Sequence, residues 1–151
     1  MNKFLTESME KIFNTLGSNL DEFKDKTILI TGANGLIGGF LSDFFIYLND
    51  KHDFNCKLVL TSLSDQPKRL GDSIYRNDIK YYSRDLTNDA WFFDEIDFCI
   101  YCAGYAQPNK FLSDAKKTYQ LNVDSMVRTF ESVMFDRKKP KMLFISSSEV
   151  Y

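Results

Sequence analysis

Residue types that support metal or redox chemistry are scarce in this chain of 151 residues. It has one histidine, His52, which follows a polar stretch where we expect a solvated surface position, so a histidine-dependent triad has no other candidate. Cys99 and Cys102 form a Cys-x-x-Cys pair, but the surrounding apolar run predicts a buried strand. Residues three apart on a strand point to opposite faces, so neither a disulfide nor a metal site is expected.

Excess charge of one sign and long hydrophobic runs are also missing. Lys and Arg number 19 against 21 Asp and Glu, without basic clusters, which argues against a nucleic-acid partner. Apolar runs such as Phe44–Leu48 are far shorter than the roughly 20 residues that span a bilayer. The first residues lack the features of a signal peptide, and an odd number of cysteines indicates reduced thiols. We therefore expect a cytoplasmic protein without a membrane partner.

The chain divides into a short extension and one domain. Apolar residues spaced by three and four predict an amphipathic helix within residues 1–24, which packs on the core or on a partner. Residues 25–151 alternate apolar strands with helices. The strands are predicted at Thr27–Ile30, Lys57–Thr61, Ile79–Ser83, Phe98–Cys102 and Met142–Ser146. Such alternation predicts an α/β fold with a doubly wound parallel sheet, the Rossmann fold.

Two helices carry clear apolar stripes. The first follows the first strand, and a second is predicted from about Ser113 to Phe135. The first stripe comprises Leu36, Ile37, Phe40, Leu41, Phe44, Phe45 and Leu48. The second comprises Tyr119, Val123, Met126, Val127, Phe130 and Val133. Both stripes are expected to face the sheet.

A glycine-rich turn between the first strand and its helix is the most informative motif. Gly32 permits a tight exit from the strand, Gly35 permits backbone to approach a pyrophosphate, and Gly38 permits close packing of helix on sheet. The intervening Asn34, Leu36 and Ile37 complete this candidate cofactor-binding turn. Backbone N–H groups and the positive helix end suit an anion, so the segment predicts dinucleotide binding.

The spacing Gly-x-x-Gly-x-x-Gly resembles the extended short-chain dehydrogenases/reductases, and within them the NAD-dependent epimerase/dehydratase family of nucleotide-sugar enzymes. The resemblance covers about residues 26–151. It includes Asp85 and Leu86 after the third strand, Ala103 and Gly104 after the fourth, and Asn122 in the long helix. It implies that Asp85 reaches the adenine, that Ala103 and Gly104 lie beside the ribose and nicotinamide, and that Asn122 braces the neighbouring strand.

The end of the second strand departs from the family pattern. NAD-specific members usually place an aspartate there, whereas this chain has Thr61 and Ser62. Either hydroxyl suits a ribose or a 2′-phosphate, with Lys68 or Arg69 as more distant cations. NAD is the cofactor that the resemblance implies, and NADP stays open.

The segment Ser-Ser-Ser-Glu-Val-Tyr at 146–151 matches the family's catalytic loop. The resemblance implies that Ser147 hydrogen-bonds the reacting sugar oxygen and that Glu149 handles a proton. Ser148 stands where 4,6-dehydratases carry an aspartate, and the string is closer to UDP-glucuronate decarboxylases. A decarboxylase-like or epimerase-like reaction through a 4-keto sugar is therefore favoured over dehydration, with a nucleotide sugar as substrate and a role in bacterial surface-polysaccharide synthesis.

The family places its catalytic Tyr-x-x-x-Lys a couple of dozen residues beyond the segment at 146–151, so that motif lies outside these residues. We therefore expect them to form the N-terminal portion of a longer enzyme, truncated before the substrate-binding region, and to be inactive alone. The alternative is a non-catalytic dinucleotide-binding sensor or scaffold, which explains the missing tyrosine without truncation. The resemblance also implies a homodimer, with the helix containing Tyr119 and Val133 as the candidate interface.

Overall fold

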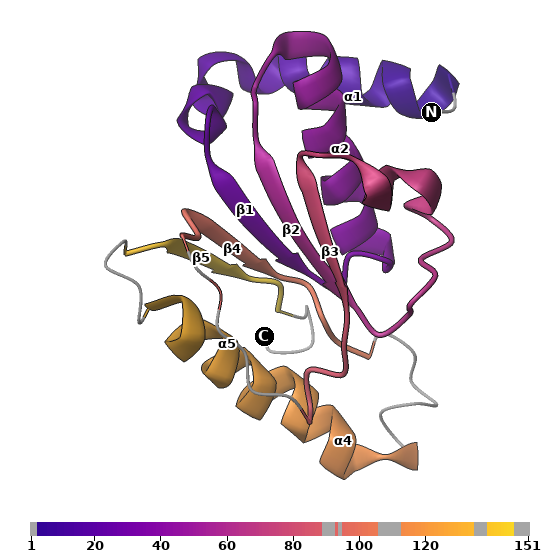
Figure 1. The fold of residues 1–151 in the computed structure, drawn as a ribbon, viewed down its shortest axis with the longest axis vertical. Coiled ribbons are helices and arrows are strands. Elements are labelled where there is room, and N and C mark those ends of the chain that lie inside the picture. The colour runs from indigo at the N-terminus through magenta and orange to yellow at the C-terminus, as the bar shows by residue number, and fades with distance from the viewer. Residues whose placement is uncertain (1–2, 89–92, 94, 106–112, 135–138, 147–151) are drawn as a thin grey trace.

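A five-stranded parallel sheet forms the centre of the molecule (Figure 1). The computed structural model of the chain describes residues 3–88, 93, 95–105, 113–134 and 139–146. The strands are β1 (Thr27–Thr31), β2 (Lys57–Ser62), β3 (Ile79–Ser83), β4 (Phe98–Tyr101) and β5 (Lys141–Phe144). Their order is β3-β2-β1-β4-β5, so the direction of winding reverses between β1 and β4. This order confirms the predicted doubly wound α/β fold.

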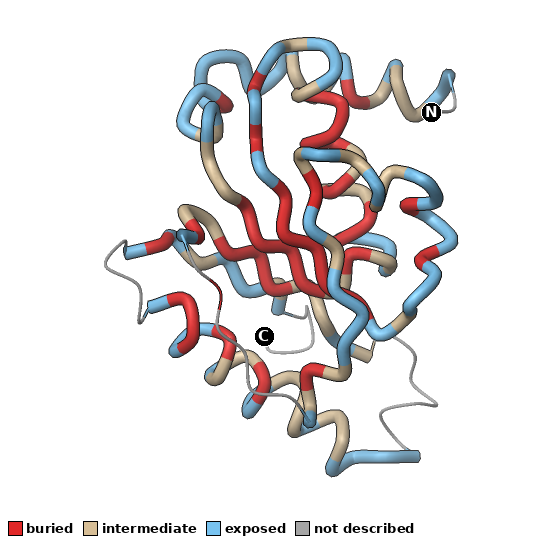
Figure 2. The backbone as a smooth tube through the Cα atoms, in the orientation of Figure 1, coloured by how far each residue is buried: buried red, intermediate tan, exposed pale blue. Residues whose placement is uncertain are grey.

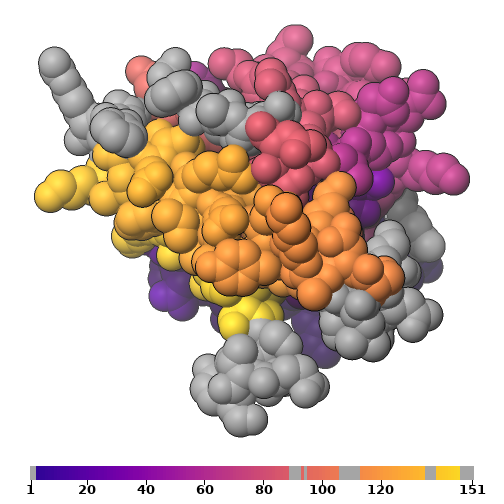
Figure 3. Space-filling view, turned by 90° about the horizontal axis from the view of Figure 1, so that it is seen from below, coloured from indigo at the N-terminus to yellow at the C-terminus, as the bar shows by residue number. Residues whose placement is uncertain are grey.

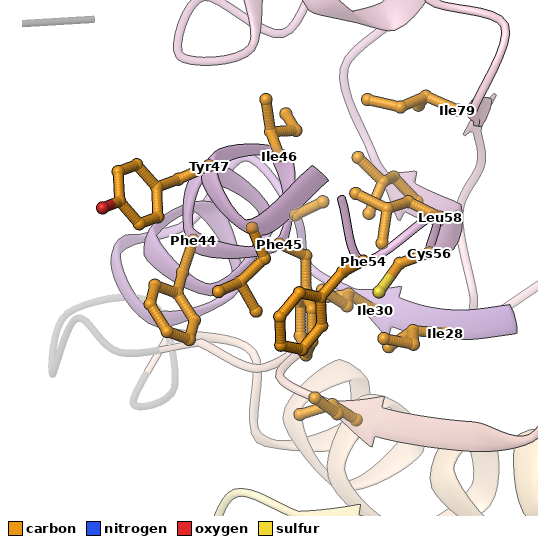
Figure 4. Close-up of a cluster of buried hydrophobic side chains, with 14 of the residues drawn as sticks. Ile28, Ile30, Phe44, Phe45, Ile46, Tyr47, Phe54, Cys56, Leu58 and Ile79 are labelled. Atoms are coloured by element: carbon orange, nitrogen blue, oxygen red, sulfur yellow. The ribbon is translucent and has the colours of Figure 1, made fainter. Parts of the chain in front are cut away.

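Helix α2 (Leu36–His52) fills one face of the sheet (Figure 4). Its aromatic and aliphatic residues from Phe44 to Leu48 are all buried, together with strand residues such as Ile30 and Leu58. Leu36 and Ile37, which begin the apolar pattern of this helix, are 83% and 49% exposed. Gly38 and Gly39 are buried instead. Because Gly38 has no side chain, the first turn of α2 can approach the backbone at the end of β1 closely.

Helix α1 (Lys3–Leu16) covers the outer side of α2 (Figure 1). Met9 has no exposed surface and belongs to the same core cluster as α2. The predicted continuous helix is interrupted at Gly17, whose φ of 50° turns the chain into a 3-10 helix, Gly17–Phe23. The extension therefore packs on the core, which explains why α2 is apolar on more than one side.

His52 is not the solvated residue that its polar surroundings suggested. Its ring stacks on Phe13 with centroids 3.5 Å apart, and its Nε2 lies 3.2 Å from the hydroxyl of Tyr47. That hydroxyl donates to Glu10 on α1. Burial and the neighbouring carboxylate raise the pKa of Tyr47 to about 12. His52 thus contributes to the packing of α1 against α2. This contact joins residues distant in the sequence, so the polarity of the neighbouring residues does not predict it.

The opposite face of the sheet carries helices α4 (Ala115–Tyr119) and α5 (Ser125–Met134), joined by a π-helical turn, Gln120–Asp124. The predicted inward stripe is largely wrong. Val133 is buried and Met126 half-buried, but Tyr119 is 59% exposed. The other stripe residues Val123, Val127 and Phe130 are also exposed. The small residues Ser125, Thr129 and Ser132 face inward instead.

A π-helical turn, Gln120–Asp124, precedes α5. Within α5 itself the face with Ser125, Thr129 and Ser132 is buried, whereas Val127 and Phe130 are exposed. Small side chains then allow α5 to approach the strands closely. The second core cluster is correspondingly small, with Val133 packing against Leu29, Val59 and Cys99.

Burial is uneven across the sheet (Figure 2). β1 and β2 are almost completely buried, whereas β5 exposes Leu143 and Phe144. β5 pairs with β4 and has no partner on its other side among the described strands. Within the described residues no helix is both long and apolar enough to cross a membrane.

The buried centre of the sheet should dominate stability. Leu60 on β2 has no exposed surface, so Leu60→Ala should lower the free energy of unfolding by about 2–5 kcal/mol. Leu36→Ala, the same change at a side chain that is 83% exposed, should cost under about 0.5 kcal/mol. Urea unfolding followed by circular dichroism measures both. Equal losses would contradict the assignment of the core.

Candidate functional site

A cleft lies at the carboxyl ends of the strands, beside the point where the winding reverses. Its volume is about 290 Å³. Four loop regions supply its walls, after β1, β2, β3 and β4. The lining residues are Gly32, Asn34, Gly35, Ser62, Leu63, Ser64, Arg84, Asp85, Leu86, Thr87, Cys102, Ala103, Gly104, Tyr105 and Leu121. Most of the predicted cofactor-binding residues therefore come together in one place.

The glycine turn is packed too tightly for side chains. Gly32 has a φ of 66°, and a Cβ there would lie 2.9 Å from the carbonyl oxygen of Cys102. A Cβ on Gly38 would lie 2.5 Å from the carbonyl oxygen of Gly32. The N–H of Ala33 donates to the carbonyl of Thr61 at 2.9 Å and ties the turn to β2. Both glycines are therefore required by backbone packing.

The first turn of α2 opens on this cleft. Gly35 is the N-cap residue, and no side chain caps the helix. The first N–H groups of a helix have no acceptor within the helix, and the helix dipole adds positive potential there. The N–H of Gly35 donates to the carbonyl of Gly32 at 2.9 Å, and the exposed Leu36 and Ile37 follow it in this turn. The arrangement fits a phosphate or pyrophosphate group.

Asp85 stands at the opposite wall of the cleft. Its carboxylate accepts hydrogen bonds from the backbone N–H of Thr87 at 3.0 Å and from the Thr87 hydroxyl at 2.6 Å. Lys117 on α4 forms an ion pair with it at 3.3 Å. Partial burial raises the pKa of Asp85, but the bonds from Thr87 and Lys117 outweigh burial and leave it below its usual value. The carboxylate is therefore charged and fixed in orientation.

Two residues of α5 hold the backbone beneath this wall. The Ser125 hydroxyl donates to the carbonyl of Leu86 at 2.7 Å. Arg128 donates to the carbonyls of Leu86 and Thr87, each at 3.1 Å. The sequence did not identify these residues. Their signal was weak, because a serine and an arginine in a helix are more often solvated surface residues.

The two hydroxyls proposed from the sequence at the end of β2, those of Thr61 and Ser62, lie in different surroundings. Thr61 is fully buried, and its hydroxyl has no hydrogen-bond partner among the described residues. Ser62 lines the cleft. Arg69 pairs with Asp43 at 2.8 Å, so this suggested cation already has an ionic partner. Arg84, which the sequence did not single out, lines the cleft instead.

The end of β4 completes the cleft. The Thr31 hydroxyl accepts the N–H groups of Cys102 and Ala103, both at 3.1 Å, and so joins β1 to this loop. A Cβ on Gly104 would lie 3.2 Å from the amide oxygen of Asn122, so the backbone of Gly104 runs close to the π-helical turn. Ala103 and Gly104 thus leave the cleft open.

The cysteine pair lies in and directly after β4. Cys99 is fully buried and Cys102 is half-buried, and burial raises the pKa of Cys102 to about 11. All three cysteines are free thiols. The part of the chain that the structure describes contains no cluster of side chains able to hold a metal ion.

The two predicted catalytic residues, Ser147 and Glu149, lie outside the described residues. The strand that leads to them is placed, because the N–H of Ile145 donates to the carbonyl of Tyr101 at 3.0 Å. Ile145 therefore lies at the same edge of the sheet as the loop after β4.

Comparisons with known proteins agree with this geometry. Residues 28–151 match the model of the NAD dependent epimerase/dehydratase family. A UDP-N-acetylglucosamine 4-epimerase from Methanobrevibacter ruminantium M1, solved with UDP-N-acetylmuramic acid, is similar in fold (TM-score 0.68, 23% identity, 85% of this chain and 40% of that chain). So is the Bordetella bronchiseptica enzyme WbmF with NAD+ (TM-score 0.65, 15% identity, 86% and 41%).

A third similar structure is the epimerase Mth375 from Methanothermobacter thermautotrophicus (TM-score 0.69, 13% identity, 90% of this chain and 39% of that chain). Among curated proteins no relative matches. The chain spans about 40% of the length of these solved structures.

The glycine turn yields a matched pair of substitutions. Gly38→Ala should lower the free energy of unfolding by about 1–3 kcal/mol and weaken ADP binding at least about tenfold, because its Cβ meets backbone. Gly39→Ala meets chiefly the flexible side chain of Arg69 and should cost under about 1 kcal/mol. Thermal unfolding and titration calorimetry with ADP measure the two effects. If Gly38→Ala bound ADP normally, the turn would not be the diphosphate site.

Proposed function

The chain belongs to the NAD dependent epimerase/dehydratase family, and from this premise we propose that it is the cofactor-binding portion of an NAD-dependent nucleotide-sugar enzyme. The observation that carries the proposal is the uncapped first turn of α2 opening on a cleft at the switch point of a parallel sheet. Ligands bind open α/β sheets at that position.

In this proposal each wall of the cleft holds one part of the dinucleotide. The amides of Leu36 and Ile37 bind the pyrophosphate, and Asp85 accepts hydrogen bonds from the adenine. Ala103 and Gly104 leave room for the ribose and nicotinamide, which supply a reversible hydride acceptor when bound. The network from Ser125 and Arg128 keeps the adenine wall in place.

We assign the chemical step to the segment after β5. Ser147 holds the reacting sugar oxygen by a hydrogen bond, and Glu149 accepts or returns a proton. The favoured reactions are epimerisation or decarboxylation of a nucleotide sugar through a 4-keto intermediate. Support comes from the Ser-Glu-Val-Tyr string at residues 148–151 and from the UDP-sugar epimerases among the similar structures.

The proposal covers the chain's organisation and setting as well. Residues 1–24 form an extension, residues 25–151 the NAD(P)-binding domain, and the proton-transfer Tyr-x-x-x-Lys belongs to a longer polypeptide. The chain's 40% share of similar structures supports this division. Free, buried thiols favour a reducing compartment, so we place the protein in the cytoplasm, in surface-polysaccharide precursor synthesis.

Activity measurements test this function. Residues 1–151 should bind NAD+ in titration calorimetry but convert neither UDP-N-acetylglucosamine nor UDP-glucuronate, followed by NMR of the sugar products. A complete polypeptide with a Tyr-x-x-x-Lys should turn over one such substrate, and Ser147→Ala or Glu149→Gln should lower kcat about 10²–10⁴-fold. Turnover by residues 1–151 alone would refute the division. NAD+ binding by the complete polypeptide without any turnover would favour a sensor or scaffold.

A homodimer is the proposed assembly. Val123, Val127, Phe130 and Met134 are exposed and follow one another at intervals of three or four residues along the helix. Figure 3 shows the side of the molecule on which the segment containing α4 and α5 lies. A twofold axis would pair this stripe with itself, because the same patch on both copies is self-complementary.

Substituting the stripe tests the dimer. Phe130→Glu should convert the complete protein from dimer to monomer in light scattering, because two buried carboxylates would face each other. Glu131→Gln, on a neighbouring exposed position, is the control and should stay dimeric. A wild-type protein that is monomeric at micromolar concentration would contradict the proposal.

A further inference from the structure

Four donors from the described residues surround the carboxylate of Asp85. Its Oδ1 accepts from the backbone N–H of Thr87 at 3.0 Å and from the Thr87 hydroxyl at 2.6 Å. Its Oδ2 accepts from the side-chain amide of Asn88 and from Lys117 Nζ, each at 3.3 Å. A carboxylate has about four acceptor positions, so a further donor binds only where one of these contacts is displaced.

The contact that is easiest to displace is the one from Lys117. The two bonds to Oδ1 come from within the turn and are shorter than those to Oδ2. Asn88 belongs to the same turn, since its N–H donates to the carbonyl of Asp85 at 3.1 Å. Lys117 instead reaches Asp85 from α4, so its ammonium can leave Oδ2 while the turn keeps its hydrogen bonds.

The surroundings of Lys117 link it to the cleft. The hydrogen bond and charge of Asp85, together with the nearby Tyr105, raise the pKa of Lys117, and Tyr105 lines the cleft. The Lys117 side chain is 37% exposed, so water can hydrate its ammonium after it leaves the carboxylate. Asp114 caps α4 by accepting the Lys117 N–H at 2.9 Å, so the start of the helix does not depend on the ion pair. Opening the ion pair therefore costs little.

We propose that the ion pair between Lys117 and Asp85 is an autoinhibitory contact, which the exocyclic amino group of adenine displaces when a dinucleotide binds. This inference rests on the proposed dinucleotide function and deepens it, because it describes how the same cleft is regulated. The amino group donates to Oδ2 in place of the ammonium, and the ammonium donates to water. Lys117 therefore competes with the adenine for Asp85 rather than helping to bind it.

Two nucleotides that differ only in the amino group isolate this competition. ADP carries the amino group, and purine riboside 5′-diphosphate has a hydrogen atom in its place. Titration calorimetry on the complete protein gives both dissociation constants, and their ratio measures the preference for ADP. Any attraction between Lys117 and the diphosphate is common to both ligands, so the ratio reports the contact of the amino group.

Substitutions of Lys117 should change this preference in opposite directions. Lys117→Met removes the ammonium but keeps an unbranched side chain, so it should raise the preference for ADP about threefold or more. Lys117→Arg should lower the preference below the wild-type value, because a guanidinium can bind a carboxylate through two parallel hydrogen bonds. Lys116→Met removes the same charge from the neighbouring exposed position and is the matched control, which should leave the preference unchanged.

The outcomes are distinguishable. A preference for ADP that falls or stays the same in Lys117→Met would overturn the competition and leave the proposed function intact. A preference that Asn88→Ala raises and Lys117→Met does not would assign the displaced contact to Asn88 and overturn the role of Lys117. Failure of the wild-type protein to bind either nucleotide, while folded by circular dichroism, would overturn the proposed function itself.

Discussion

The close contact between the first turn of α2 and the end of β1 is the constraint on which the rest of the site depends. Gly38 lies so near the carbonyl of Gly32 that a single methyl group would displace the backbone. Only this approach lets the uncapped helix end face the cleft rather than the solvent beyond it. The hydrogen bond from Ala33 to Thr61 then fixes the turn against β2.

Each face of the sheet supports this contact differently. On one face, aromatic residues of α2 are buried between the strands and α1, which gives a large and rigid core. On the other face, α5 packs against the sheet through small residues. There, hydrogen bonds to the carbonyls after β3 hold the helix in place of a large apolar core. Apolar burial thus anchors the end of the cleft at the glycine turn, whereas a polar network positions the end at Asp85.

The sequence predicted the features that depend on local pattern. Strand order along the chain and the glycine turn followed from periodicity and from the special backbone needs of Gly32 and Gly38. Prediction from the sequence failed where contacts between residues distant in the chain determine exposure or ion pairing. Val127 was predicted to face inward, but Thr129 is buried in its place. Stacking on Phe13 partly buries His52, and Arg69 pairs with Asp43 on the side of α2.

Backbone amide shifts in NMR would test the central claim most directly, because the claim concerns N–H groups. Titration of isotope-labelled protein with ADP-ribose should move the amide signals of Leu36 and Ile37 most, with smaller changes at Asp85 and Leu86. The amides of α1, such as that of Lys11, should stay unchanged. Saturable binding that left the first turn of α2 unperturbed and moved signals elsewhere would contradict the account.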